Sequence, residues 1–286
     1  MRTRPRALTT LLAPLLVAGL LVACGGGDDT AAGDTAAPDT SAPDTSEPTT
    51  EAPTTTIEAP TTTVSAVGHL RGTAYTFNTP DPIAGATIKV VELPDLSAVT
   101  GADGSYELEV PAGATVTPYI EAEGHYGIHH QTFIVSDDGD GLELDGVNFQ
   151  TPSTPIYDGL KALVGGFTGK DPFEGGCVIV TTVGDPRMVG MSFDEFIEFH
   201  PHGLAGATVA IEPPLATPIY FNDDVLPDTA QQTTSIDGGV LWPNVPPGEY
   251  TLTAELDGYE FATVHATCED GWVVNANPVW GLHALP

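Results

Sequence analysis

Residues 237–260 read DGGVLWPNVPPGEYTLTAELDGYE, and residues 103–126 read DGSYELEVPAGATVTPYIEAEGHY. Both stretches begin with an Asp-Gly pair, continue with a run in which apolar and polar residues alternate, and pass a proline and glycine turn into another such run. Alternation with a period of two is typical of half-buried strands, and clusters of Gly, Pro and Asp between strands mark turns. The shared pattern predicts the same β-module twice in one chain.

The order of the neighbouring motifs supports a duplication. IAGAT at 83–87 precedes the first stretch, and LAGAT at 204–208 precedes the second. One gap in an otherwise constant order is what duplication followed by a loop insertion leaves. No segment with helical length and period occurs among the strands of either copy, so we expect an all-β fold.

The two copies share AGAT, then DG before an alternating strand, then VPxG before another strand, and in this they resemble the carboxypeptidase regulatory-like domain of the transthyretin-like family. The resemblance implies a seven-stranded antiparallel sandwich that serves as a spacer or binding module, and it does not imply catalysis. We therefore expect two tandem seven-stranded antiparallel β-sandwiches (transthyretin-like), at 67–150 and 176–286. Gly104 and Gly238 are expected to form tight turns at positive φ.

The N-terminus has the features of a lipoprotein signal peptide over residues 1–24. Three arginines precede an apolar run that is too short to span a membrane as a helix, which needs about 20 apolar residues. The run ends in Leu-Val-Ala-Cys, which resembles the lipobox of bacterial lipoproteins and implies lipidation of Cys24. The alternative is an ordinary secretory signal with an incidental cysteine.

Residues 25–66 are rich in Thr, Pro, Ala, Asp and Glu and contain no aromatic residue. Such a segment has too little apolar surface to offset the entropy of ordering, so we expect a disordered stalk. Together, signal and stalk predict a protein lipid-anchored to the outer face of the cytoplasmic membrane of a bacterial cell envelope and exposed extracellularly.

The charge balance excludes one class of partner. The chain has 39 acidic residues against 8 lysines and arginines, and its formal net charge is −31. Phosphate binding depends on clustered Lys and Arg, so we expect no nucleic acid partner. The expected partners are the membrane, through the lipid anchor, and polysaccharide or another envelope protein.

Three cysteines occur in the chain. If Cys24 is lipidated, an even pair remains in an oxidising compartment, so we expect a disulfide between Cys177 and Cys268. The first and a late strand of such a sandwich can lie side by side, which would bring the two together. Two buried free thiols are the alternative.

Two short helices are expected outside the sandwiches. Residues 151–175 form a linker in which 157–164 have helical character and Gly165 and Gly166 provide a stop. In the insertion of copy two, Ser192 and Glu195 have capping-box spacing before three phenylalanines. We expect those phenylalanines to cover the core; a groove for a partner is the alternative.

Two histidine groups are weak candidates for metal ligation. They lie in GHYGIHH and FHPHG and comprise His125, His129, His130, His200 and His202. No carboxylate or cysteine is placed by sequence to complete a shell, so surface or turn histidines are the simpler interpretation and no cofactor is expected. The acidic stretch at 136–146 offers oxygen ligands for calcium but lacks EF-hand spacing, so we expect a solvated turn.

No catalytic set is apparent, so we expect a protein that is not an enzyme. Enzymes on related sandwiches carry motifs that this chain lacks, and neither GxSxG nor HExxH occurs. The leading hypothesis is a non-enzymatic cell-surface lipoprotein acting as an adhesion, scaffold or ligand-binding module. A metal-dependent envelope enzyme that uses the histidine groups is one alternative.

The other alternative is a carbohydrate-binding envelope lipoprotein, in which the insertion at 213–232 of copy two would contact the ligand. Aromatic rings beside acids and amides can stack on a sugar and bond its hydroxyls. The candidate ligand-binding residues are Tyr220, Phe221, Asn222 and Asp223. The same residues would also suit a strand packed on the sandwich.

Overall fold

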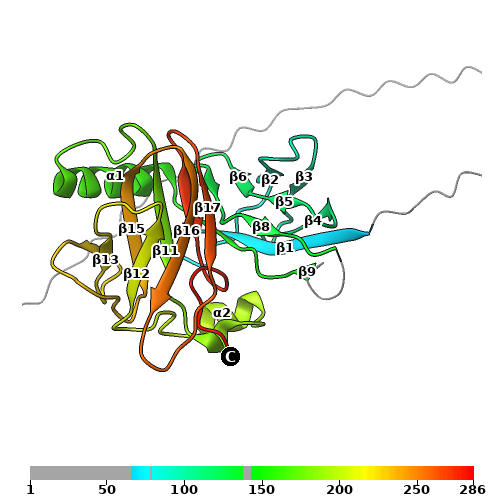
Figure 1. Ribbon diagram of the computed structural model, residues 1–286. Coiled ribbons are helices and arrows are strands. Elements are labelled where there is room, and N and C mark those ends of the chain that lie inside the picture. The colour runs from blue at the N-terminus through cyan, green and yellow to red at the C-terminus, as the bar shows by residue number, and fades with distance from the viewer. Residues whose placement is uncertain (1–65, 78, 138–142) are drawn as a thin grey trace, which may run out of the picture. The chain divides into compact units, whose positions relative to one another are not determined.

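The computed structural model describes residues 66–77, 79–137 and 143–286. The predicted signal peptide with Cys24 and the predicted stalk up to residue 65 lie outside these residues, and so does the centre of the acidic stretch at 136–146. The described residues form one compact unit (Figure 1). No helix within the described ranges is long and apolar enough to cross a membrane.

The first sandwich is built around β1 (Val67–Thr76), which pairs along its length with β4 (Ser105–Pro111). The prediction of a half-buried strand at β4 is confirmed, because Tyr106, Leu108 and Val110 are buried and the residues between them are exposed. The other strands of this sandwich are β2 (Thr87–Val90), β3 (Ser97–Val99), β5 (Thr115–Val116), β6 (Pro118–Glu121), β7 (Ile128–His129), β8 (Phe133–Ile134), β9 (Glu143–Leu144) and β10 (Phe149–Thr151).

The second sandwich has a three-stranded sheet of β12 (Thr208–Glu212), β16 (Gly248–Glu255) and β17 (Val264–Cys268). Its facing sheet contains β11 (Cys177–Thr182), β13 (Ile219–Phe221), β14 (Pro227–Asp228), β15 (Gly239–Val245) and β18 (Val273–Ala276). Between the two sheets, Trp242, Leu252, Val264 and Val274 are buried in one apolar core. Two facing layers around such a core confirm the predicted β-sandwich class.

The sheets are mixed rather than wholly antiparallel. In the described residues, β1 pairs in parallel with β9 and β10, and β18 pairs in parallel with β11 and β7. A parallel neighbour needs a long connection, and here whole sandwich layers separate the paired strands in sequence. Alternation along a single strand does not reveal the direction of its partner, so the sequence pattern did not predict these pairings.

The pairing of β18 with β7 joins the two sandwiches. Val273 and Val274 of the second copy pair with Ile128 and His129 of the first. As a result one nine-stranded sheet runs through both copies, in the order β14-β13-β15-β11-β18-β7-β6-β2-β3.

Residues after β18 strengthen this junction. Trp280 Nε1 donates to the carbonyl oxygen of Asp145 at 2.9 Å, and its ring lies 5.0 Å from that of Phe133. The backbone N–H of Gly281 donates to Oε1 of the buried Gln131 at 2.9 Å. The C-terminal residues of copy two therefore pack into copy one.

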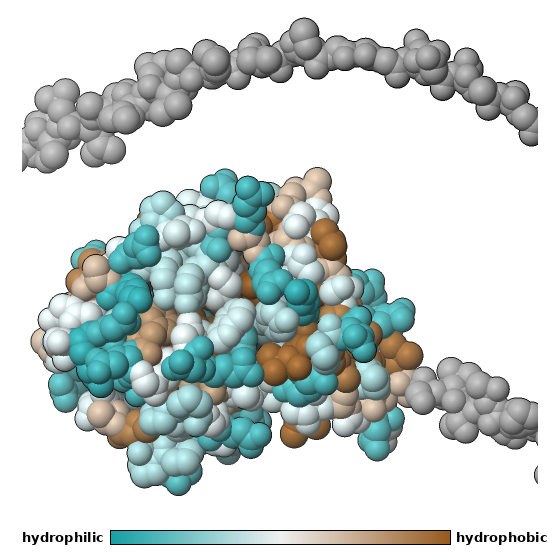
Figure 2. All heavy atoms as spheres, turned by 90° about the horizontal axis from the view of Figure 1, so that it is seen from above, coloured by the Kyte–Doolittle hydropathy of each residue, from teal (hydrophilic) through white to brown (hydrophobic). Residues whose placement is uncertain are grey.

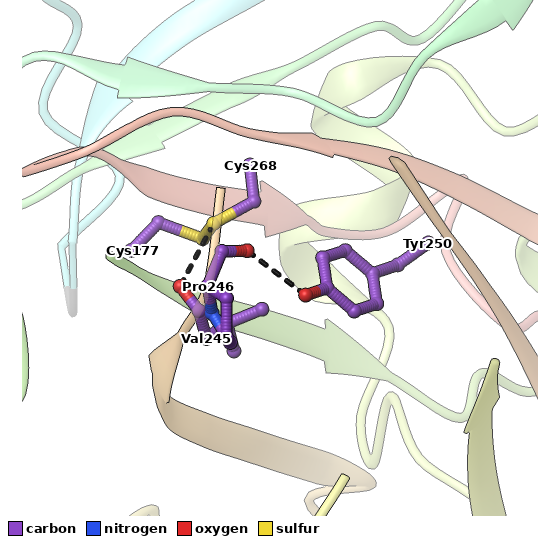
Figure 3. Close-up of a disulfide and its surroundings, with 5 residues drawn as sticks. All are labelled: Cys177, Val245, Pro246, Tyr250 and Cys268. Carbon is purple, nitrogen blue, oxygen red and sulfur yellow. Dashed lines mark hydrogen bonds between the residues drawn. A yellow bond between two sulfur atoms is a disulfide. The ribbon is translucent and has the colours of Figure 1, made fainter. Parts of the chain in front are cut away.

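The predicted disulfide between Cys177 and Cys268 is present, with 5.7 Å between the two Cα atoms. It does not join strands that lie side by side. Cys177 is on β11 and Cys268 is on β17, so the bridge links the two facing sheets of the second sandwich (Figure 3). Beside it, the Tyr250 hydroxyl donates to the Pro246 carbonyl at 2.9 Å and holds the turn before β16.

Both predicted helices occur, but the first is longer than expected. Helix α1 spans Thr154–Thr168 and ends at Gly169, so Gly165 and Gly166 lie inside it. The prediction of a stop there is wrong: these two glycines keep the helical path, and the left-handed residue that ends a helix is Gly169, at φ 74°. Val164 packs with Val178, Ile219 and Leu241, so α1 covers the outer face of the nine-stranded sheet.

Helix α2 (Phe193–Glu198) begins with the predicted capping box between Ser192 and Glu195. A short 3-10 turn (Pro186–Met188) precedes it. Phe196 is buried with Met188, Val279 and Tyr75, and the last of these belongs to β1 of the first copy. The insertion therefore covers the junction between the two sandwiches. Figure 1 shows α1 and α2 toward opposite ends of the strands of the second sandwich.

Candidate functional site: a groove where the two insertions meet

The histidines of GHYGIHH lie at the junction of the two sandwiches. His129 and His130 are almost completely buried, with 1% and 0% of their surfaces exposed. The ring of His129 lies 4.2 Å from that of Trp272, which immediately precedes β18. Burial lowers the pKa of His129 to about 4 and that of His130 to about 3, so both are neutral at pH 7.

His125 lies apart from the pair. Its Nε2 is 3.2 Å from the hydroxyl of Thr76, and its Nδ1 is 3.2 Å from the carbonyl of Glu123. Among the described residues no three His, Cys, Asp or Glu side chains are grouped as metal ligands. The structure therefore gives the histidines of GHYGIHH packing contacts.

His200 and His202 lie in the loop that follows α2. Their rings are 4.6 Å apart, and the ring of His202 stacks on Phe196 at 4.4 Å and 14°. Nε2 of His202 lies 3.0 Å from the carbonyl oxygen of Phe196, and burial lowers the pKa of this imidazole. Two imidazoles and one benzene ring thus form a wall that α2 holds in place.

The four candidates of the 213–232 insertion separate into two pairs. Tyr220 is 3% exposed and belongs to the core, where its hydroxyl accepts from the N–H of Val209 at 3.1 Å. Asn222 shapes the loop after β13, because its Oδ1 accepts from the backbone N–H groups of Asp224 and Leu226. Tyr220 and Asn222 therefore have structural contacts.

The other pair, Phe221 and Asp223, lines a groove. The same loop places Val225 at φ 61°, a left-handed conformation that is strained for a β-branched residue, and Val225 also lines the groove. Strained backbone of this kind concentrates at binding sites.

The groove follows the outer face of the nine-stranded sheet from α1 to α2. Three adjoining hollows form it, and Gln150 and Val225 line all three. At the α1 end the lining is apolar and includes Phe77, Val180, Phe221 and Leu241. At the α2 end the hollow has a volume of about 590 Å³ and is lined by His200, His202, Asp223 and Asp237 together with Tyr75, Thr79 and Gln150 of the first copy.

The groove is the place where the two insertions of copy two converge, and the first copy completes its wall. On the face seen in Figure 2, hydrophobic side chains occur as separate patches between hydrophilic ones. Scattered patches of that kind are normal on folded proteins and do not mark a site. A hollow with an apolar end and a few convergent polar groups does match the general form of ligand sites.

Asp237 is the most unusual polar group in the groove. Its Oδ2 accepts from the N–H of Gly239 at 3.0 Å, and in the described part of the chain no Lys, Arg or His forms an ion pair with it. Burial raises the pKa of Asp237, and the nearby charge of Asp223 raises it further. The ionised carboxylate is therefore held without a compensating cation.

Sequence reasoning identified Asp237 only as a turn residue. A signal was nevertheless present in the residue that follows the Asp-Gly pair, which is Ser105 in the first copy and Gly239 in the second. A Cβ at position 239 would collide with the ring of Phe221 and with the carboxylate of Asp237. Gly239 thus allows Phe221 to lie against the turn of Asp237.

The groups that line the groove are suited to holding a ligand. Within the described residues that line it, no hydrogen bond joins an imidazole to a hydroxyl or thiol, which is the pairing that activates a nucleophile. The aromatic rings and the apolar α1 end can hold a ligand by burying its apolar surface. The carboxylates of Asp223 and Asp237 can hold it by charge.

No protein-family profile matches the chain, and no curated protein sequence matches it. Solved structures show a distant likeness. One is a type II cohesin–X-dockerin complex from Acetivibrio cellulolyticus, with 20% identity over 30% of this chain and 58% of that one, at a TM-score of 0.26. Another is the Bacillus anthracis TIE protein, with 13% identity over 74% of this chain and 33% of that one, at a TM-score of 0.24.

A third is the minor pilin of Streptococcus agalactiae, with 10% identity over 76% of this chain and 95% of that one, at a TM-score of 0.25. This chain thus spans less than two thirds of the cohesin complex chain and of the TIE protein. Since each TM-score lies below 0.5, the likeness carries no argument about what this protein does.

Proposed function

We propose that this chain is a non-enzymatic, lipid-anchored protein of the bacterial cell surface that binds a ligand in the groove between α1 and α2. The observation that carries the proposal is the convergence of both insertions of copy two on that groove. If the two insertions only lengthened loops, nothing would require them to lie against the same groove. The first copy supplies part of the wall, so the shared sheet supports the site.

The sandwiches themselves are proposed to be two carboxypeptidase regulatory-like modules. The support is the repeated turn chemistry: Gly104 and Gly238, at equivalent places after an aspartate, both have φ 76°. This confirms the predicted positive-φ turns. Modules of this kind serve as rigid supports, which agrees with a site assembled on a continuous sheet.

The proposed location is the outer face of the cytoplasmic membrane, with Cys24 lipidated and residues 25–66 acting as a stalk. The arginines, the apolar run and the lipobox-like ending support the anchor, and the disulfide supports an oxidising compartment. Another envelope protein or polysaccharide is the proposed class of partner. The net charge of −31 argues against nucleic acid.

Fractionation of cells that express the chain tests the anchor. We expect the unmodified protein in the membrane fraction, with a diacylated N-terminal cysteine in its mass spectrum and with the folded unit open to protease added outside the cells. Cys24→Ser is expected to move the protein out of the membrane fraction. Membrane association that persists in Cys24→Ser, or protection from the protease, would refute a lipid-anchored surface protein.

Carbohydrate binding is the second candidate, and one observation favours it: Phe221 and Asp223 place an aromatic ring and a carboxylate in the same groove. A glycan array probed with the unmodified chain and with Phe221→Ala tests it. The matched control is Phe167→Ala, because Phe167 lies on α1 with 43% of its surface exposed and does not line the groove. Binding that survives Phe221→Ala would exclude this groove as a sugar site.

A further inference from the structure

The two ends of the groove differ in a way that specifies a ligand. The α1 end is lined by apolar side chains, and its one cation, Lys161, is already paired with Asp171 at 2.9 Å. The α2 end carries Asp223 and Asp237, and no ion pair in the described residues involves either of them. An occupant of both ends would need an apolar part and a part that suits carboxylates.

The surroundings of Asp237 favour a positive charge on that part. Its carboxylate is half-buried and receives one backbone hydrogen bond, from Gly239. A carboxylate removed from water is stabilised by a cation nearby, and a second carboxylate close by does the opposite. A ligand cation placed between Asp223 and Asp237 would offset the desolvation of the Asp237 carboxylate. It would also reduce the repulsion between the two carboxylates.

The other groups at this end are compatible with an organic cation. His202 stays neutral at pH 7, because burial lowers its pKa, so it adds no repulsive charge. The ring of His202 stacks on Phe196, and the ring of His200 lies tilted beside His202, so aromatic side chains line the hollow that also holds the carboxylates. The hollow of about 590 Å³ lies within the range of sites for small organic ligands, roughly 300–1,000 Å³.

We infer that the groove binds an organic cation with an apolar arm: the arm lies along Phe221 toward α1, and the positively charged group lies between Asp223 and Asp237. The inference rests on the proposed function and names the chemical class of its ligand. An anionic ligand would be repelled, and a neutral sugar would leave the two carboxylates uncompensated.

The probes are three compounds that share an octyl chain and differ in the head group: octylammonium, octyl sulfate and octyl glucoside, each used below its micellar concentration. The protein is the full chain with Cys24→Ser, purified without detergent, and binding is measured by isothermal titration calorimetry at pH 7. We expect octylammonium to bind, octyl sulfate not to bind, and octyl glucoside to bind more weakly than octylammonium.

Asp237→Asn is the decisive variant, since an asparagine oxygen can still accept from Gly239 N–H. The dissociation constant of octylammonium should rise about tenfold or more, as expected when one of two partners of a partly buried charge contact is neutralised. The matched control is Asp103→Asn, at the equivalent turn of the first sandwich, and it should leave the dissociation constant unchanged. Asp223→Asn, at an exposed position, provides a second test that does not depend on the turn.

Phe221→Ala should weaken all probes that bind, and Phe167→Ala should weaken none. Equal binding of sulfate and ammonium, or ammonium binding that survives both Asp237→Asn and Asp223→Asn, would overturn the inference. Preferred binding of the glucoside would also overturn it and would support the carbohydrate alternative. Absence of binding by every probe would refute the cation site, while the fractionation test of the surface protein would stand on its own result.

Discussion

Asp103 and Asp237 occupy the same turn of the two sandwiches and have opposite electrostatics. Each precedes a glycine at φ 76°, and each accepts a hydrogen bond from the backbone N–H two residues later. The pKa of Asp103 is lowered, first by the Ser105 hydroxyl and then by the Ser105 N–H. The pKa of Asp237 is raised, because burial outweighs the hydrogen bond from Gly239.

The comparison shows that the repeated Asp-Gly residues determine the conformation of the turn. The residues packed around the turn determine the electrostatics of its aspartate. In the first copy Asp103 faces solvent and only forms the turn. In the second copy the insertions cover the equivalent turn with Phe221 and the loop after α2, so the same aspartate becomes part of a groove. The first copy contributes its own variable stretch, GHYGIHH, to the junction.

The largest effect should come from the disulfide, which only the second sandwich has among the described residues. The bridge closes a sequence separation of 91 residues, and the chain-entropy estimate for such a loop is about 4–5 kcal/mol. Cys177→Ala with Cys268→Ala should therefore lower the free energy of unfolding in urea by about that amount. Cys24→Ser serves as the control and should leave it unchanged, and an equal midpoint for all three proteins would contradict the prediction.

The next effect concerns the junction itself. Trp272→Ala removes a ring that packs on His129 at 4.2 Å and on Tyr119 at 5.6 Å. We expect a loss of about 2–3 kcal/mol, less than the roughly 3–5 kcal/mol for a fully buried aromatic residue, because Trp272 is only partly buried.

Differential scanning calorimetry should then show two transitions in Trp272→Ala where the unmodified protein shows one, since the two sandwiches lose part of their coupling. Tyr259→Ala is the control, because 44% of the surface of Tyr259 is exposed. A single unshifted transition in Trp272→Ala would mean that the sandwiches are coupled without this ring.

Acid should weaken the same junction. The pKa of His129 in the folded protein is about 4, below the usual value of 6.5, so protonation favours the unfolded chain. The stability that neutral His129 provides is complete above pH 6.5 and is lost as the pH falls toward 4, which amounts to about 2 kcal/mol at pH 5.

Urea unfolding at pH 7 and pH 5 measures this loss. His129→Asn should show a smaller difference between the two pH values than the unmodified protein, and His200→Asn, in an exposed loop, should show the same difference as the unmodified protein. An unchanged difference in His129→Asn would remove His129 from the acid response.

The smallest effect is also the most direct test of the opening comparison. Asp237→Asn removes a charge that the folded state disfavours, so thermal unfolding at pH 7 should move up slightly, by less than about 1 kcal/mol of unfolding free energy. Asp103→Asn removes a charge that hydrogen bonds favour, so its midpoint should move down. Shifts of the same sign in both variants would show that the two turns are electrostatically equivalent.

Much of the fold could be predicted from short sequence patterns, because the structures that these patterns specify are themselves local. The alternation at Tyr106, Leu108 and Val110, the turn glycines Gly104 and Gly238, and the capping box at Ser192 all depend on neighbours a few residues away. The pairing of Cys177 with Cys268 followed from parity and compartment, and the structure adds that the bridge crosses between facing sheets.

The candidate site was less predictable because it depends on contacts between distant segments. Phe221 and Asp223 were identified from their residue types, and Tyr220 beside them is a core residue because strand neighbours point to opposite faces. Gln150 joined the groove only because the pairing of β18 with β7 places the two copies together, and Asp237 joined it because Phe221 and the insertions of copy two cover its turn. No property of either residue alone indicates that arrangement.

The position of β18 in the nine-stranded sheet also has a consequence for the order of folding. This strand follows every other described strand in sequence, yet it lies between β11 and β7 and is hydrogen-bonded to both. Neither sandwich can complete its sheet before β18 and Trp280 are available, so a chain that emerges N-terminus first stays incomplete until these residues have emerged as well. Such an order of completion makes the final closure of both sandwiches depend on the last strand of the chain, so folding of the two modules is coupled and late.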